Sequence, residues 1–302
     1  MMLFILSKKN LELSRAEAVN LLDLHDYELV GNILTAQTRR KDYWRLAYTR
    51  EAHELLFRCN IENLEACIKK HNWKIMDYAV RRKGAGPSER RLANMVYHSI
   101  DKPKVNLRKP KDLITFFFEG DEVLVGRLVW SNEEDFRSRK PHLRADHSPV
   151  SLDPQLARCL VNMSGARYHV LDPCCGTGGL LLEAGLMGLS AEGIDIDPVM
   201  IRRAKRGLDH HGVDHRLHNK DVFQWMRKTR HIATDLPYGK NTRDIDDSFY
   251  RDFLKWLEQV MVGRAVVVFP HWIDVRRMSR LKVKDSFQYY IHRSMSKKIV
   301  IY

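Results

Sequence analysis

A stretch of small residues in the second half of the chain has the composition of a ligand-binding turn. The sequence Asp172-Pro-Cys-Cys-Gly-Thr-Gly-Gly179 lies between two short apolar runs, so we expect a strand, a turn and a helix in succession. Its glycines would let a ligand lie against bare backbone. The spacing is neither that of a dinucleotide-binding loop nor that of a phosphate-binding loop with its lysine. By itself, such a turn is weak evidence of a site.

Acidic residues follow the next two predicted strands. Asp195 lies 19 residues beyond Gly176, in a position where a carboxylate can accept both hydroxyls of a ribose. Asp221 follows the third predicted strand, where it suits the amino group of adenine. Alone, each acid is better explained as a helix cap or a solvated residue. Together, acids at three consecutive strand ends predict an adenosine-containing cofactor held without a phosphate site, namely S-adenosylmethionine.

The run Asp235-Leu236-Pro237-Tyr238, at the fourth predicted strand end, carries the sharpest signal. A nucleobase amine is a poor nucleophile because its lone pair is delocalised into the ring. An Asp oxygen and a main-chain carbonyl can accept its two hydrogens, the Pro can fix the turn, and the Tyr can stack on an extruded base. The plainer reading is a strand-terminal turn with a half-buried Tyr. Because this motif follows a cofactor-binding turn in the sequence, we favour a role in methyl transfer to a base amine over the plainer reading.

Alternating strands and helices must position these strand ends. Asp153-Pro154 opens a helix, with the Asp as cap and the Pro in the first turn. The alternation predicts an α/β fold with a Rossmann-like, doubly wound, mostly parallel sheet and an antiparallel edge strand, which binds ligands at the carboxyl ends of its strands. The predicted strands are 168–171, 191–194, 216–219, 231–234, 265–269, 283–292 and 297–302.

The first 130 residues predict a mixed α+β region instead of strict alternation. Ser14-Arg-Ala-Glu17 has the spacing of a capping box and predicts the start of a helix. We expect a strand at 43–48, a helix at 51–58 and further strands up to Trp130. The polar, basic stretch 131–150 reads as a linker, so we place the main domain border there.

Basic residues outnumber acids, with a formal net charge of +13 over 302 residues. The excess is concentrated between Lys69 and Lys111, where 13 Lys and Arg stand against three acids. A run of charges is usually a solvated face. Here the basic residues have so few acids beside them that they repel one another, which favours a surface that contacts nucleic-acid phosphates. The linker cations Arg137, Arg139, Lys140 and Arg144 fit either a hinge face or a second phosphate contact, and we expect the phosphate contact from Arg139 and Arg144. The contacts expected within the basic segment are Arg81, Arg82, Lys83, Arg90, Arg91, Lys104, Arg108 and Lys109.

Cysteine and histidine usage argues against structural disulfides and metals. Five cysteines without a C-x-x-C pair indicate reduced thiols and a cytoplasmic location. Four histidines lie between His210 and His218, but they straddle a predicted helix end and strand, with no Cys or carboxylate geometry to complete a set of metal ligands. We interpret them as a solvated basic turn and predict no metal. No uncharged stretch approaches the ~20 residues of a membrane span, so we expect no membrane partner.

Four motifs occur in the order seen in class I S-adenosylmethionine-dependent methyltransferases: Asp-Pro-x-Cys-Gly-Thr-Gly, Gly-Ile-Asp-Ile-Asp, Lys-Asp-Val and Asp-Leu-Pro-Tyr-Gly. The form Asp-Leu-Pro-Tyr-Gly-Lys resembles the archaeal tRNA guanosine N2-methyltransferases that act at nucleotide 10. The opening Leu-Phe-Ile-Leu-Ser and residues 139–162 are also similar to that family. The resemblance therefore spans most of the chain.

The resemblance implies a division of the chain and a set of site residues. Residues 1–50 would form a ferredoxin-like part, 51–130 a THUMP domain that grips tRNA, 131–150 a basic linker, and 151–302 the methyltransferase domain. Asp235, Leu236, Pro237 and Tyr238 would form the catalytic motif. The implied cofactor contacts are Asp172, Cys175, Gly176, Gly178, Asp195, Ile196, Asp221 and Val222.

The implied activity is methyl transfer to N2 of the guanosine at tRNA position 10, giving N2-methylguanosine or N2,N2-dimethylguanosine. Two alternatives stay open: an amino-methyltransferase for another base in RNA or DNA, and a non-catalytic RNA-binding protein with a relict cofactor fold. Some members of the wider family bind a small zinc-containing activator at a sheet edge. The sequence does not decide whether this chain has such a partner.

Overall fold

The computed structural model describes residues 1–143, 152–238, 246–292 and 295–302, which form two compact units. The N-terminal unit consists of Met1–Arg15, Leu22–Trp44 and Thr49–Glu133. The C-terminal unit consists of Ala16–Leu21, Arg45–Tyr48 and Glu134–Tyr302. Two short segments from the first 50 residues therefore belong to the C-terminal unit.

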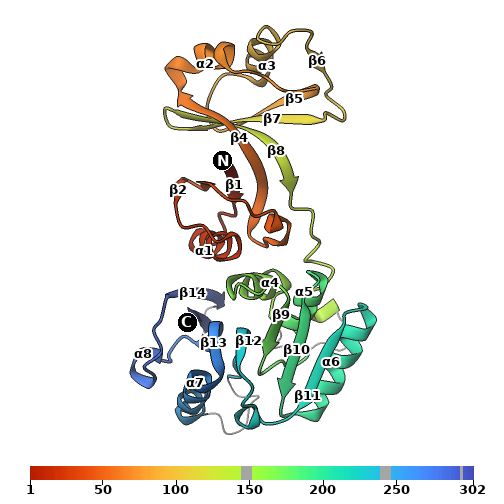
Figure 1. The fold of residues 1–302 in the computed structure, drawn as a ribbon, viewed down its shortest axis with the longest axis vertical. Helices are drawn as coiled ribbons and strands as arrows, with labels where there is room; N and C mark the ends of the chain where they lie inside the picture. Colours follow the sequence, from red (N-terminus) through yellow and green to blue (C-terminus); the bar gives the residue numbers. More distant parts are fainter. Residues whose placement is uncertain (144–151, 239–245, 293–294) are drawn as a thin grey trace. The chain divides into compact units, whose positions relative to one another are not determined.

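The described residues of the N-terminal unit form a mixed sheet of eight strands in the order β2-β3-β1-β4-β8-β7-β5-β6 (Figure 1). Strand β5 is parallel to both β6 and β7, and the other neighbours are antiparallel. The strands are β1 (Met2–Leu6), β2 (Tyr27–Val30), β3 (Ile33–Ala36), β4 (Thr49–Asn60), β5 (Asp77–Lys83), β6 (Lys104–Val105), β7 (Asp112–Glu119) and β8 (Glu122–Ser131). The helices are α1 (Leu11–Leu22), α2 (Leu64–Lys70) and α3 (Glu89–Tyr97), with the 3-10 turns η1 (Asp42–Arg45) and η2 (Ile61–Asn63).

The helix predicted at 51–58 is wrong, because these residues belong to the long strand β4. Glu51-Ala-His-Glu-Leu-Leu is rich in helix-forming residues, but β4 pairs with β1 on one side and with β8 on the other. Ala52 and His53 are fully buried there. Cross-strand packing therefore overrides the local helix propensity. Residue 50 lies within β4, so one sheet runs through both predicted N-terminal domains, and their division stays a prediction.

The capping box predicted at Ser14 is also wrong. Helix α1 begins three residues earlier, at Leu11, and its cap is Asn10, whose Oδ1 accepts the Leu13 N–H at 3.0 Å. Ser14 instead donates to the Asn10 carbonyl at 2.7 Å. Glu17 is fully buried and accepts the main-chain N–H groups of residues 47 and 48 at 2.7 and 2.8 Å. The strand predicted at 43–48 is wrong as well, because Asp42–Arg45 form a 3-10 turn and the N–H groups of residues 47 and 48 bond to Glu17 instead of to a neighbouring strand.

The described residues of the C-terminal unit form a sheet of seven strands in the order β11-β10-β9-β12-β13-β15-β14 (Figure 1). The pairs along β11 to β13 are parallel, and β15 is antiparallel to both β13 and β14. This confirms the predicted mostly parallel methyltransferase-like sheet. The strands are β9 (His169–Asp172), β10 (Ser190–Asp195), β11 (His215–Asn219), β12 (Thr229–Asp235), β13 (Met261–Pro270), β14 (Asp285–His292) and β15 (Met295–Ile301).

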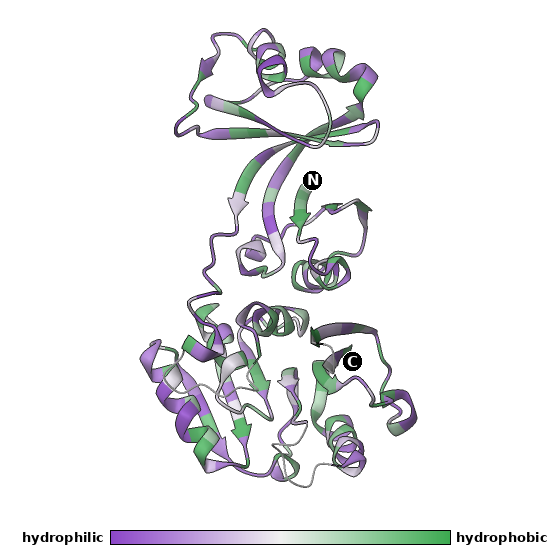
Figure 2. Cartoon of the chain, turned by 180° about the vertical axis from the view of Figure 1, so that it is seen from behind, coloured by the Kyte–Doolittle hydropathy of each residue, from purple (hydrophilic) through white to green (hydrophobic). Residues whose placement is uncertain are grey.

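Helices flank this sheet and begin at the capping residues that the sequence predicts. Asp153 accepts the Gln155 N–H at 3.0 Å, and Pro154 occupies the first turn of its helix. In Figure 2, α6 alternates hydrophilic and hydrophobic residues, as a helix with one buried face does. None of the described helices has the length and apolar character needed to span a bilayer. The helices are α4 (Pro154–Met163), α5 (Gly179–Leu186), α6 (Pro198–His210), α7 (Asp247–Val260) and α8 (Val275–Met278), with η3 (Pro141–Leu143) and η4 (Val222–Gln224).

Candidate active site

The glycine turn lies where the sequence predicts it, between β9 and α5. The Cys175 N–H donates to the Ile194 carbonyl at 2.9 Å and ties the turn to β10. Gly176 and Gly178 have positive φ angles of 52° and 77°, which cost a residue with a side chain about 1–2 kcal/mol. No described atom lies within 4 Å of the position that a Cβ on Gly176 would take. The backbone at Gly176 is therefore bare, as a ligand lying on the turn requires.

Gly193 on β10 allows the turn to pack closely against the sheet. A Cβ at this position would lie 2.4 Å from Leu181 Cδ1 and 3.0 Å from Cys175 Sγ. Cys175 is 5% exposed, and its thiol faces Gly193. Its side chain thus supports the turn from within, while its main chain is part of the bare surface.

Asp195, at the end of β10, organises the turn through both of its oxygens. Oδ2 accepts the Gly176 N–H at 2.8 Å, and Oδ1 accepts the Asp197 N–H at 2.9 Å. Burial raises the pKa of Asp195, and these two hydrogen bonds oppose the rise. Each carboxylate oxygen has a second lone pair, so Asp195 can still accept two hydroxyls.

Asp172, at the end of β9, is nearly fully buried beneath the turn. Its Oδ1 accepts the Thr234 hydroxyl at 2.7 Å and the Cys174 N–H at 3.2 Å. Burial raises the pKa of Asp172 to about 7, and the negative charges of Asp195 and Asp235 add to the rise. The site therefore concentrates negative charge next to the glycine turn.

Asp221 caps the short turn η4, with its carboxylate accepting the Phe223 N–H at 3.0 Å. Val222 is buried, whereas Ile196 is 69% exposed and Phe223 is 37% exposed. These two apolar side chains directly follow the strand ends that carry Asp195 and Asp221. Both side chains can make apolar contacts with a purine. Phe223 is a candidate cofactor contact that the sequence analysis did not predict.

Hydrogen bonds place two of the predicted acids at the glycine turn, where Asp172 accepts the Cys174 N–H and Asp195 accepts the Gly176 N–H. Cys174 is partly buried, and desolvation is the largest cause that raises the pKa of its thiol well above the usual value. The remaining contributions come from the negative charges of Asp172, Asp195, Asp235 and Asp221. The end of β12 is joined to the same place, because the hydroxyl of Thr234, which precedes Asp235, donates to Asp172 at 2.7 Å.

Asp235, at the end of β12, is paired with a residue that sequence reasoning missed. Its Oδ2 accepts a hydrogen bond from Lys297 Nζ at 2.5 Å, and the two side chains are only 14% and 2% exposed. Among the residues that the structure describes, Oδ1 of Asp235 is buried without a hydrogen-bond partner. Burial raises the pKa of Asp235, and Lys297 opposes that rise. The pKa of Lys297 is itself raised, because the contacts with Asp235 and Tyr238 outweigh its burial.

The rest of the predicted catalytic motif continues from Asp235 as irregular backbone after β12. Leu236 is fully buried, and its N–H donates to the Val268 carbonyl at 3.1 Å. The Pro237 carbonyl accepts the Tyr250 hydroxyl at 2.9 Å. Tyr238 is partly exposed, and Lys297 Nζ lies 4.5 Å from its ring centroid. The following Gly239 and Lys240 lie outside the described residues.

Basic residues at the end of β5 are exposed, as the phosphate-contact prediction requires. Arg82 donates to the Gly86 carbonyl at 2.7 Å, and Arg81 lies 3.9 Å from Glu89. Lys83 is more strongly engaged, because its Nζ contacts both carboxylate oxygens of Glu51 at 2.6 Å. Arg81 and Arg82 therefore have more freedom to contact phosphates than Lys83.

A shallow groove runs along α3 in the N-terminal unit. Arg90 and Arg91 line it, and both are exposed. Its other lining residues are small, polar or apolar: Ser88, Ala93, Asn94, Tyr97 and Val105. Lys104, Arg108 and Lys109 are also exposed, in or just after β6. The groove combines positive charge with an exposed aromatic ring, which suits a nucleic-acid strand.

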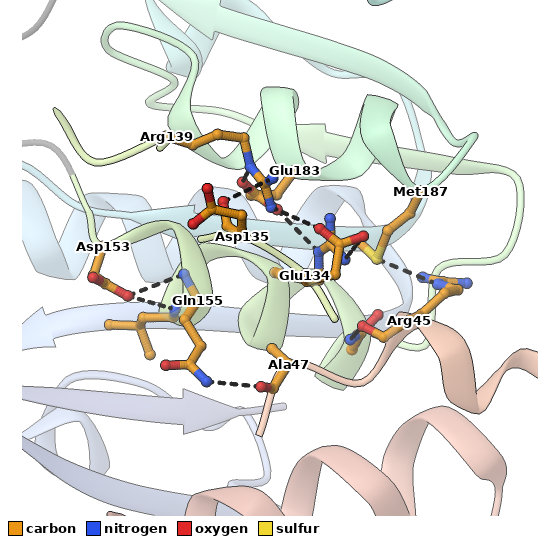
Figure 3. Close-up of polar contacts among 12 residues, drawn as sticks. Arg45, Ala47, Glu134, Asp135, Arg139, Asp153, Gln155, Glu183 and Met187 are labelled. Atoms are coloured by element: carbon orange, nitrogen blue, oxygen red, sulfur yellow. Dashed lines mark hydrogen bonds and ion pairs between the residues drawn. The ribbon is translucent and has the colours of Figure 1, made fainter. Parts of the chain in front are cut away.

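Arg139, which the sequence predicts to contact phosphate, forms ion pairs within its own unit. Its side chain is 12% exposed and lies between two carboxylates, at 2.8 Å from Glu183 and 3.0 Å from Glu134 (Figure 3). The fully buried Glu183 is also paired with Arg158 at 2.9 Å. Arg139 therefore fixes the start of the linker to α5 of its own unit. Arg144, the other linker residue predicted to bind phosphate, lies outside the described residues.

The histidines between α6 and β11 do not form a metal site among the described residues, where no suitable group of ligands occurs. His218 instead lies 3.1 Å from the buried carboxylate of Glu192, and His215 bonds the Val213 carbonyl at 2.9 Å. Both side chains thus have ordinary local partners.

Comparisons with known proteins agree with this geometry. The family described as "RMKL-like, methyltransferase domain" matches residues 141–297. The tRNA (guanine(10)-N2)-dimethyltransferase of Methanothermobacter thermautotrophicus is 32% identical over 84% of this chain and 82% of its own length. The protein of the same name from Methanocaldococcus jannaschii is 26% identical over 99% of this chain and 98% of its own length.

A solved structure with the same fold covers the whole chain. TrmN from Thermus thermophilus matches with a TM-score of 0.52 and 18% identity over 99% of this chain and 98% of its own. This likeness supports the fold, and the sequence relatives establish the family. The chain belongs to the tRNA (guanine(10)-N2)-dimethyltransferase family of S-adenosylmethionine-dependent methyltransferases.

Proposed function

We propose that the chain methylates N2 of the guanosine at position 10 of tRNA, forming N2-methylguanosine and, after a second transfer, N2,N2-dimethylguanosine. One observation carries the proposal beyond family membership: hydrogen bonds hold Asp172 and Asp195 against the glycine turn, and Asp235, at the end of the neighbouring strand, has a buried oxygen without a hydrogen-bond partner among the described residues. A transfer site needs a cofactor surface and an acceptor for the amine side by side. This edge of the sheet provides both.

The residues at the glycine turn fit S-adenosylmethionine. Open space above Gly176 leaves room for a ligand on the backbone, and Asp195 keeps free lone pairs for the two ribose hydroxyls. In the proposal, Asp221 faces the adenine amino group, and Ile196 and Phe223 contact the purine. Asp172 would lie near the ligand's amino group, whose positive charge would favour the ionised form of this acid. When bound, this cofactor supplies a methyl carbon on a positively charged sulfur that leaves as a thioether.

Asp235 and the Leu236 carbonyl would hold the two hydrogens of the guanine amine. As the nitrogen lone pair forms its bond to the methyl carbon, positive charge develops on nitrogen, and the Asp235 carboxylate stabilises it. The proton then leaves to Asp235 or to water, so that no separate strong base is required. Tyr238 would stack on the face of the extruded guanine.

The exposed cations of the N-terminal unit would hold the tRNA backbone. We assign phosphate contacts to Arg81, Arg82, Arg90 and Arg91, with Lys104, Arg108 and Lys109 as further contributors. Tyr97 offers a ring on which an unpaired base can stack. A cytoplasmic location, as predicted from the cysteines, would suit this substrate.

The proposal is tested by measuring methyl transfer from labelled S-adenosylmethionine to purified tRNA, ribosomal RNA and DNA. We expect turnover with tRNA alone; turnover only with ribosomal RNA or DNA would favour the alternative amino-methyltransferase. Calorimetry with S-adenosylmethionine tests the relict-fold alternative, since a relict would bind no cofactor. Turnover by the purified chain without added protein would show that a zinc-containing activator is dispensable.

A further inference from the structure

Among the residues that the structure describes, Lys297 forms an ion pair with Asp235, and it comes from a distant part of the sequence. It lies on β15, opposite Pro270 of β13 in the antiparallel register, which brings it to the carboxyl edge of the sheet. Its side chain is 2% exposed, although lysine is almost never fully buried without a partner. A buried ammonium beside the predicted catalytic carboxylate calls for a functional explanation.

We propose that Lys297 is a positioning residue for methyl transfer, an inference that rests on the proposed function. It pins Oδ2 of Asp235, so that the unpartnered Oδ1 stays free to accept a hydrogen from the guanine amine. It also supports the Tyr238 ring from one side, so that the other side can stack on the base.

The contact distances fit this division of labour. Lys297 Nζ lies 2.5 Å from Oδ2 and 4.5 Å from the centroid of the Tyr238 ring. A carboxylate held at one oxygen loses the rotation that would otherwise average the direction of the other. An ammonium against a ring face adds roughly 0.5–2 kcal/mol of attraction, which favours one ring orientation. One side chain therefore fixes both the hydrogen-bond acceptor and the stacking surface.

Lys297 also keeps Asp235 in the form that accepts hydrogen bonds. Burial favours the protonated acid, which would present a donor where the amine needs an acceptor, and the neighbouring ammonium opposes this. The other titratable groups near Asp235 are Asp172 and Cys174, beside the glycine turn, Tyr238, and Tyr250 on α7. Of these groups, only Asp172 is an acid that adds negative charge near neutral pH. Lys297 is thus the group that favours ionised Asp235.

The first test reads Asp235 directly in the free protein, without any activity assay. The side-chain carboxyl carbon of Asp235 is titrated by NMR in wild type and in Lys297→Met, with assignment from Asp235→Asn. We expect the pKa of Asp235 to rise by about 1–3 units in Lys297→Met, the usual effect of a removed opposite charge. The matched control is Lys298→Met, on the same strand, whose Nζ bonds the Ile273 carbonyl instead. An unchanged titration in Lys297→Met overturns the proposal.

The second test reads the reaction. We expect kcat in Lys297→Met to fall at least tenfold and its acid limb to move to higher pH, with little change in KM for S-adenosylmethionine. Lys297→Arg, which keeps the charge, should restore the wild-type acid limb. A loss of kcat without any shift of the acid limb would mean a purely structural role. If Lys297→Met does not fold, Lys297→Gln replaces it, with the same expected shifts.

The two tests separate this inference from the proposed function. If the wild type transfers no methyl group to tRNA, the proposed function fails, while the NMR titration still decides whether Lys297 controls Asp235. If the wild type is active and neither profile responds to Lys297→Met, only the inference fails.

Discussion

Replacing Gly176 by alanine should separate cofactor binding from fold stability. A non-glycine residue at its φ of 52° costs about 1–2 kcal/mol of backbone strain. The new methyl group would meet no described atom within 4 Å, so it adds no clash inside the protein itself. It would stand instead in the space assigned to the ligand. We expect the affinity for S-adenosylmethionine to fall at least tenfold, or about 1.4 kcal/mol.

The matched control for this change is Gly188→Ala. Gly188 has a φ of 74° and likewise no described atom within 4 Å of its Cβ position, but it follows α5, away from the strand ends that carry the acids. Both variants should lose about 1–2 kcal/mol of unfolding free energy in urea, since the strain is similar. Only Gly176→Ala should lose affinity by calorimetry. Wild-type affinity in Gly176→Ala, or an equal loss in both variants, would refute the assignment of the cofactor to this turn.

Three further predictions concern the acids and the basic face. Asp235→Ala should abolish turnover while leaving calorimetric affinity for S-adenosylmethionine nearly intact; a variant with most of its activity would contradict the mechanism. Neutralising Arg81, Arg82, Arg90 and Arg91 together should weaken tRNA binding and reduce the slope of log K against log salt by roughly 0.7–0.9 per lost contact. Neutralising Lys8 and Lys9, which are exposed outside the basic segment, is the control, and equal slopes in both variants would make that segment a solvated face. Because the pKa of Asp172 is raised from 3.8 to about 7, the folded state binds an extra proton between these values, so this group destabilises the fold as pH rises through that range. Asp172→Asn should lose less unfolding free energy than wild type between pH 5 and pH 8 in urea titrations, and parallel losses would contradict that pKa.

The parallel sheet was predictable because its signals are local. Strand β9 is a short apolar run that ends in an acid, and Asp153-Pro154 caps α4 by itself. Strand β4 shows the limit of such signals. Its Glu51-Ala-His-Glu-Leu-Leu segment favours a helix by local propensity. It is a strand because it pairs with β1 and β8, which both lie far from it in the sequence.

The acids of the site could also be predicted, because each follows its own strand. Lys297 could not be predicted, since a lysine in the polar half of the Ser-Lys-Lys-Ile-Val-Ile segment is expected to face solvent. Its burial depends on the antiparallel pairing of β15 with β13, which places it beside Asp235. The ion pairs of Arg139 could not be predicted either, because its buried partner Glu183 lies 44 positions away in the sequence.

The central claim is best tested by locating the transferred methyl group. Purified protein is incubated with a tRNA transcript and trideuteromethyl-labelled S-adenosylmethionine, and the nucleosides and nuclease fragments are analysed by mass spectrometry. A second transcript carries inosine at position 10, which keeps the purine ring but lacks the exocyclic amine. We predict labelled N2-methylguanosine at position 10 of the first transcript and no label in the second. Label on adenosine or cytidine, or undiminished label in the inosine transcript, would contradict the account.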